Sequence, residues 1–76
     1  MKTQKESIDF NNMMEAVCRN LPEGWSLVLD LENGAATVRL YEPKEKEMGL
    51  PDPADKTLVE QMNDALLVAN GWVNVP

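Results

Sequence analysis

The sequence contains no histidine and only one cysteine, Cys18. Histidine is the commonest metal ligand and the usual general base near neutral pH, so its absence argues against most catalytic and metal-binding schemes. A single cysteine forms neither an internal disulfide nor a multi-cysteine zinc site. Arg19 is next to Cys18, but adjacent residues on a helix do not face each other, so we assign the thiol no role. We expect a protein that is not an enzyme.

Signatures of bound ligands are also missing. The four glycines are scattered through the chain and form no phosphate-binding loop. No Asp-x-Asp-Gly calcium loop is present. Asp52 and Asp55 are the nearest approach to a metal-binding pair, but capping of a helix explains both. We therefore expect no metal and no cofactor.

Long apolar runs are absent too. No stretch approaches the roughly 20 residues that a membrane span requires. Residues 1–6 lead into an amphipathic segment, whereas a signal peptide would lead into an apolar one. The expectation is a cytoplasmic protein without membrane contact. With 76 residues and a hydrophobic fraction of 43%, the chain is long enough for a single small folded domain, 1–76.

Basic residues are scarce. The chain has 7 Lys and Arg against 13 Asp and Glu, a net charge of −6. Residues 1–22 are neutral overall, so the whole net charge lies on residues 23–76. Binding of nucleic acid depends on Lys and Arg that neutralise phosphates. The composition therefore disfavours direct contact with nucleic acid and favours contact with a basic surface.

The most informative stretch runs from residue 25 to 41. Asn33-Gly34 lies between alternating apolar and polar residues, which predicts a β-hairpin with a type I′ turn and positive φ at both central residues. The turn places Glu32 opposite Ala35 and thereby fixes the register of all the other pairs. One face of this hairpin is apolar and comprises Leu27, Leu29, Leu31, Val38 and Leu40.

The segment before the hairpin predicts an amphipathic helix that ends near Asn20. Thr3, Ser7 and Asp9 compete as its N-cap. We favour a start at Ser7 or Asp9, with residues 1–6 frayed. The apolar stripe of the helix comprises Phe10, Met13, Met14, Val17 and Leu21.

Residues 43–51, between the hairpin and a second helix, predict a solvated loop, from which Met48 and Leu50 dip back towards the core.

For the second helix the pattern indicates Asp52 as N-cap and Pro53 as the first helical residue. Its apolar face comprises Leu58, Val59, Met62, Ala65, Leu66 and Ala69.

The C-terminal end of the second helix carries its own signal. Gly71 is suited to the left-handed position of a Schellman cap. That geometry would place Trp72 against Leu67. The tail over residues 72–75 alternates and is long enough for a short third strand.

The order of elements predicts an α+β fold, a two-layer α-β-β-α arrangement with a central antiparallel hairpin. In outline this is similar to the double-stranded RNA-binding domain. That fold has three strands, whereas two are clear in this sequence. It also has a lysine cluster before its last helix, where this chain has Asp52, Asp55 and Lys56. We therefore do not assign the chain to that family.

The outer face of the hairpin and the acidic residues after it are the candidate binding surface. Asp30 and Arg39 lie diagonally across the hairpin and are expected to pair. Aromatic residues and Arg are enriched at protein interfaces. The alternative is an ordinary solvated sheet face without a binding function, with acidity that serves solubility alone. The candidate binding residues are Trp25, Asp30, Arg39, Tyr41, Glu45, Glu47, Asp55 and Glu60.

Two functions remain open. The first is a non-enzymatic module that docks through its acidic surface on a basic protein, such as a nucleic-acid-handling protein whose site it blocks. In size and charge the chain resembles inhibitor proteins of phages and mobile elements. The second is a small structural protein that forms a homodimer or an assembly. It would do so through a free strand edge or through the apolar face around Leu67, Val68 and Trp72.

Overall fold

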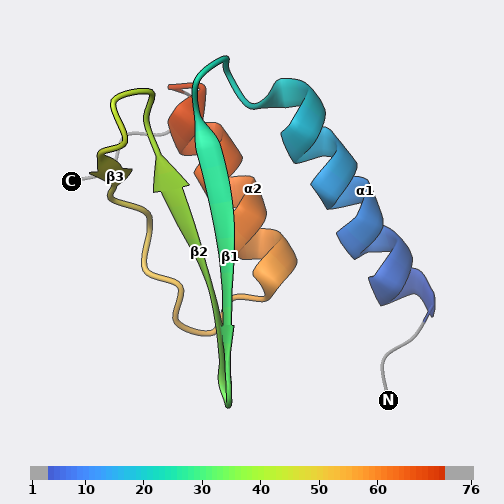
Figure 1. The fold of residues 1–76 in the computed structure, drawn as a ribbon. Coiled ribbons are helices and arrows are strands. Elements are labelled where there is room, and N and C mark those ends of the chain that lie inside the picture. Colours follow the sequence, from blue (N-terminus) through green and yellow to red (C-terminus); the bar gives the residue numbers. More distant parts are fainter. Residues whose placement is uncertain (1–3, 72–76) are drawn as a thin grey trace.

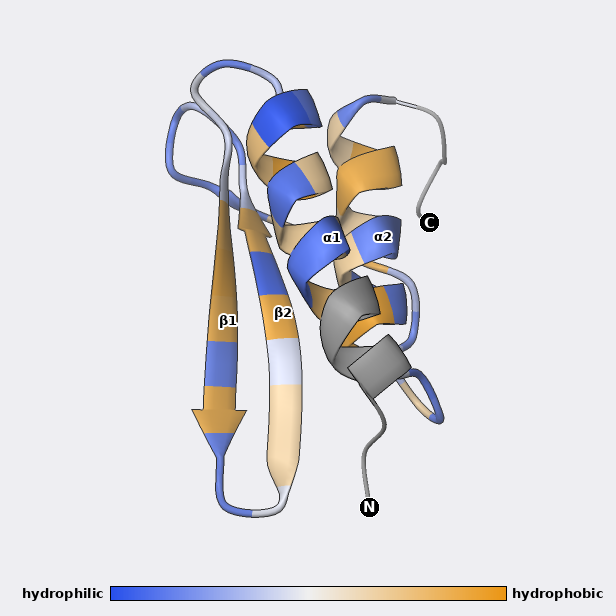
Figure 2. Cartoon of the chain, turned by 90° about the vertical axis from the view of Figure 1, so that its right-hand side faces the viewer, coloured by the Kyte–Doolittle hydropathy of each residue, from blue (hydrophilic) through white to orange (hydrophobic). Residues whose placement is uncertain are grey.

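The computed structural model describes the backbone of residues 4–71 and the side chains of residues 10–71. The three strands form one antiparallel sheet in the order β1-β2-β3, and both helices lie on the same side of it (Figure 1, Figure 2). This confirms the α+β fold with a central hairpin. The elements are α1 (Gln4–Asn20), β1 (Ser26–Glu32), β2 (Ala35–Tyr41), β3 (Glu47–Met48) and α2 (Leu58–Ala69).

The register of the hairpin matches the prediction at every pair, from Ser26 opposite Tyr41 to Glu32 opposite Ala35. The turn type does not. Gly34 has a φ of 82°, but Asn33 is not in the positive region, so the signs are those of a type II turn and the predicted type I′ turn is wrong. A type II turn needs a left-handed conformation only at its second central residue, and here that residue is the glycine.

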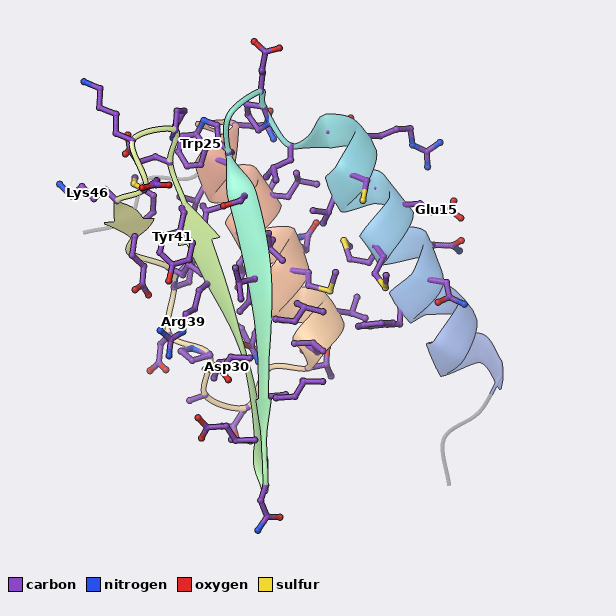
Figure 3. The ribbon with its side chains drawn as sticks, viewed as in Figure 1. Glu15, Trp25, Asp30, Arg39, Tyr41 and Lys46 are labelled. Carbon is purple, nitrogen blue, oxygen red and sulfur yellow. The ribbon has the colours of Figure 1, made fainter. Side chains whose placement is uncertain are left out.

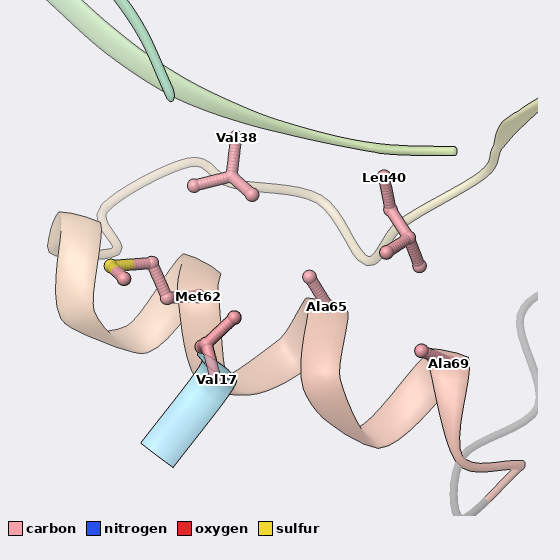
Figure 4. Close-up of a cluster of buried hydrophobic side chains, with 6 residues drawn as sticks. All are labelled: Val17, Val38, Leu40, Met62, Ala65 and Ala69. Carbon is pink, nitrogen blue, oxygen red and sulfur yellow. The ribbon is translucent and has the colours of Figure 1, made fainter. Parts of the chain in front are cut away.

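The core lies between β2 and α2. Leu40, at 0% exposure, and Val38 project from β2 onto Met62 and Ala65 of α2, and Val17 of α1 closes the cluster (Figure 4). Burial of each such aliphatic side chain contributes about 1.5–3 kcal/mol. Helix α2 packs on β2, and α1 packs on α2. The central strand is therefore the part of the sheet that the helices contact most directly.

The apolar face of the hairpin is covered only over part of its length. Leu31 belongs to that face by alternation, yet its side chain is 68% exposed. The hairpin tip projects past the ends of both helices (Figure 1). Since α2 begins only at Leu58, no part of it reaches the tip.

Helix α1 ends at Asn20, as predicted, but begins at Gln4, earlier than the favoured start at Ser7 or Asp9. Lys, Gln and Glu are good helix formers, so the residues before Ser7 extend the helix at little cost. Thr3, the N-cap that such a start implies, lies outside the described residues. Of the two described helices, neither combines the length and the apolar character of a membrane span.

The segment predicted as a solvated loop contains a third strand. Met48 pairs with Leu40 and Glu47 pairs with Tyr41, which makes β3 a two-residue addition to the free side of β2. Met48 and Leu50 are half-buried and pack against the core, as predicted. The strand expected from residues 72–75 falls outside the described residues.

The start of α2 also differs from the prediction. Thr57, and not Asp52, is the N-cap: its hydroxyl accepts from the Glu60 N–H at 3.1 Å, and the Glu60 carboxylate accepts from the Thr57 N–H at 2.7 Å. The Asp52 side chain instead accepts from the Ala54 N–H in the preceding loop. Asp55 has a φ of 62°, so a right-handed helix cannot pass through it.

The end of α2 agrees with the prediction. Gly71 has a φ of 74° and donates its N–H to the Val68 carbonyl at 3.0 Å, one of the two hydrogen bonds of a Schellman motif. The expected contact of Trp72 with Leu67 falls outside the described residues.

Replacement of Gly34 by Val is expected to lower the free energy of unfolding by about 1 kcal/mol or more, because a β-branched residue resists positive φ. A Cβ at this position would meet nothing within 4 Å, so the loss is conformational and not steric. Gly34→Asn is the matched control and should cost less, since Asn tolerates the left-handed region. Equal denaturant midpoints for Val and Asn would contradict this account.

Thr57→Ala is expected to cost about 1 kcal/mol, the usual effect of removing an N-cap. Asp52→Ala should cost clearly less, because Asp52 caps no helix in the structure. Both values come from urea denaturation of the two variants. The reverse order would place the helix start at Asp52.

Candidate functional site

The face of the sheet opposite the helices carries a row of polar and aromatic side chains. Asp30 from β1 and Arg39 and Tyr41 from β2 follow one another along this face (Figure 3). The Arg39 Nη2 donates to the Asp30 Oδ2 at 3.1 Å, which confirms the expected diagonal pair. Val28, beside Arg39, is 44% exposed, so this face is open to solvent.

Strand β3 adds a fourth member to the row. It places Glu47 opposite Tyr41 in the sheet. Hydrogen bonding to Tyr41, followed by the negative charges of Asp30 and Glu47, raises the pKa of Arg39. These neighbours favour the charged form of a guanidinium that is already cationic near neutral pH. We call Asp30, Arg39, Tyr41 and Glu47 the outer-face cluster.

A shallow hollow of about 410 Å³ adjoins the Tyr41 end of the cluster. It brings Glu45 into the same concavity as Tyr41. The turn that shapes it depends on Glu42, whose Oε1 accepts from the N–H groups of Lys44 at 2.8 Å and Lys46 at 3.2 Å. The lining consists of Gly24, Ser26, Tyr41, Glu42, Pro43 and Glu45.

Three of the candidate binding residues belong neither to the cluster nor to the hollow beside it. Trp25 is half-buried and packs against the core, so its first role is structural. Asp55 is exposed in the loop before α2. The Glu60 carboxylate is engaged in the capping box. The structure thus concentrates the candidates on the outer face and at the β2–β3 turn, and separates Asp55 and Glu60 from them.

Two residues with defined roles were not singled out from the sequence. Glu42 organises the β2–β3 turn, and Gln61 is buried on α2. The Gln61 Nε2 donates to the Ala36 carbonyl at 3.2 Å and so links α2 to the start of β2, next to the hairpin turn. A usable signal existed for Gln61 only, because it is a polar residue at a position adjoining the apolar stripe of α2.

Charge on the described side chains is unbalanced. Residues 10–71 carry eleven acidic and five basic residues, which leaves a net charge of −6. Three of the basic residues, Arg19, Arg39 and Lys56, pair with Glu15, Asp30 and Asp64. Most carboxylates of residues 10–71 are therefore without a cation from the same range.

The described residues offer little to a small ligand. A cavity of about 200 Å³ lies between β2, the loop after β3 and α2, below the size range typical of small-molecule sites. The hollow beside Tyr41 has the volume of such a site but is shallow and open. Within the same part of the chain, no group of three or more potential ligands is placed to hold a metal ion. What this surface offers chemically is hydrogen bonding, charge and an aromatic contact.

The third strand brings the order of elements to that of the double-stranded RNA-binding domain. The start of α2, where that fold carries its lysine cluster, has Lys56 engaged with Asp64 and carries Asp52 and Asp55 nearby. The charge argument against that family therefore stands. No protein-family model, no curated protein and no solved structure matches this chain.

Glu42→Ala is expected to loosen the turn that positions Glu45 and Glu47. Amide exchange at Lys44 and Lys46 should accelerate, because both N–H groups lose their acceptor. Glu42→Gln keeps an acceptor oxygen and serves as the control, with exchange close to that of the unmodified chain. Equal exchange in the Ala and Gln variants would show that the carboxylate does not hold the turn.

Proposed function

We propose that this chain is a non-enzymatic protein-interaction module that docks through its acidic surface on a basic partner protein. The observation that supports the proposal is a sheet that residues 4–71 cover on one face only (Figure 1, Figure 2). Its open face presents Tyr41 between Arg39 and Glu47. Aromatic residues and Arg supply most of the binding energy of protein interfaces, and the surrounding carboxylates favour a partner of opposite charge.

The chemistry of the partner follows from the charge. Proteins that handle nucleic acid expose clusters of Lys and Arg that bind phosphates. Such a cluster is the kind of surface to which a chain of net charge −6 is drawn. Occupation of that surface would block access of the nucleic acid. We therefore propose inhibition of a nucleic-acid-handling protein in the cytoplasm, of the type that phages and mobile elements encode, as the specific form of this function.

A second candidate function is self-assembly. The observation in its favour is β1, which pairs with β2 on one side and with no strand of residues 4–71 on the other. Leu67 and Val68 are half-buried on α2, so the described part of the apolar C-terminal face is less open than the strand edge. Trp72, the remaining member of that face, lies outside the described residues.

The docking function is tested by affinity capture from a host-cell lysate, identification of the captured protein and measurement of its binding. The variant is Glu45→Lys with Glu47→Lys, which reverses two exposed charges beside Tyr41 and leaves the Glu60 cap intact. We expect a basic partner, an affinity at least about tenfold weaker for the variant, and an association rate that falls with salt.

The matched control reverses the opposite charges in the same turn, Lys44→Glu with Lys46→Glu, and should bind as well as the unmodified chain or better. Light scattering on the free protein measures its oligomeric state and so tests self-assembly. An affinity and an association rate that change neither with salt nor with charge reversal would overturn the docking proposal. A tight dimer that captures no partner would favour self-assembly.

A further inference from the structure

The free edge of β1 has a defined hydrogen-bonding pattern. The Ala36 carbonyl accepts from Gln61, so it points away from β1. Its partner Leu31 must then direct its own N–H and C=O away from β2, because the backbone groups of an antiparallel pair alternate between the two sides. By the same alternation, Leu27 and Leu29 also present their N–H and C=O groups at the outer edge of β1.

Little within β1 protects this edge, because its only charged side chains are the two carboxylates of Asp30 and Glu32. Natural proteins shield exposed edges with Pro, Lys, bulges or inward-pointing charges. The seven residues Ser26–Glu32 contain no Pro, Lys or Arg and pair with β2 without a bulge. The described large hydrophobic side chains that stay exposed are Val28 and Leu31 on β1 and Met14 on α1. All three thus lie on the two elements that border the open edge.

The position of α1 explains why the edge stays open. Helix α1 packs on α2 and lies to the side of β1, so the helical layer extends past the edge of the sheet (Figure 1, Figure 2). A further strand beside β1 would rest over α1 as β2 rests over α2. The helical layer therefore leaves room for one more strand beside β1.

We infer that the β1 edge binds an extended segment of a basic partner protein by strand addition, with basic and apolar side chains in alternation. This inference rests on the docking function proposed above. Side chains of an added strand that face the helices would lie beside Leu27, Leu29 and Leu31, which selects apolar residues. Those on the outer face would lie beside Val28, Asp30 and Glu32. Asp30 already binds Arg39, so the exposed Glu32 is the main residue that favours Lys or Arg there.

A second copy of this chain fits the edge less well. Two-fold pairing of β1 with β1 would place both α1 helices on the same face of the joined sheet. Each α1 extends past its own edge and would meet the helices of the other copy. Two copies of net charge −6 also repel one another. A single extended basic segment meets neither obstacle.

The probe is a synthetic peptide of alternating valine and lysine with the seven-residue length of β1. Amide exchange of the full chain is measured by NMR with and without the peptide. We expect exchange at Leu27, Leu29 and Leu31 to slow by about tenfold or more on binding. Three control peptides should each bind at least about tenfold more weakly: one with the same residues in two blocks, one with Glu for Lys, and one with alternate backbone amides methylated.

The matched protein variants are Leu31→Pro and Leu31→Val. Proline removes an N–H that faces the open edge and not β2, so the hairpin ladder stays intact. We expect Leu31→Pro to lose the peptide and Leu31→Val to keep it. The exchange rates of β2 amides report whether each variant is folded.

Several results would overturn strand addition: amides of Leu27, Leu29 and Leu31 already protected in the free chain, equal binding of the alternating and blocked peptides, no binding of any peptide, or perturbation confined to the outer-face cluster. Protection in the free chain that grows with protein concentration would point to a second copy. If the captured partner still binds Leu31→Pro and remains sensitive to salt, docking stands and strand addition falls. If salt and charge reversal have no effect on that partner, docking falls as well.

Discussion

The contact of β2 with α2 is the interaction on which the rest of the structure depends. Leu40 and Ala65 are completely buried there and Met62 almost so, and the other buried apolar residues keep slightly more exposure. Among the strands of residues 4–71, β2 alone has a neighbour on both sides, and α1 reaches the core through α2. A chain of this length has a small margin of stability, so one well-packed strand–helix pair supplies a large share of it.

That one-sided anchoring creates both surfaces to which we assign a function. Because both helices cover the same face, the described residues leave the other face open, and the alternation that buries Val38 exposes Arg39. Because the anchor is the central strand, β1 is held mainly by β2 and keeps its other edge open within the described residues. The outer-face cluster and the free edge therefore follow from the same packing solution.

Sequence reasoning succeeded where one local signal had no competitor. Asn33-Gly34 and strict alternation set the hairpin register, and with it the Asp30–Arg39 pair. It failed where a second local signal was overlooked or where a tertiary contact decided. Asp52 was predicted as the N-cap of the second helix, but Asp55 is left-handed and the helix starts after it, with Thr57 as its cap. The two-residue β3 exists only because β2 offers it an edge, so the place of Glu47 beside Tyr41 could not be predicted.

In the docking that we propose, the net charge gives the open edge a selectivity that the strand alone does not have. An unprotected strand that carries Leu27, Leu29 and Leu31 would normally pair with any similar strand, including its own copy. A charge of −6 on each molecule disfavours approach of a second copy and favours approach of a basic segment. On this argument the acidity does what a lysine on an edge strand usually does. It repels a second copy of the chain and leaves the backbone groups of β1 available to a basic segment.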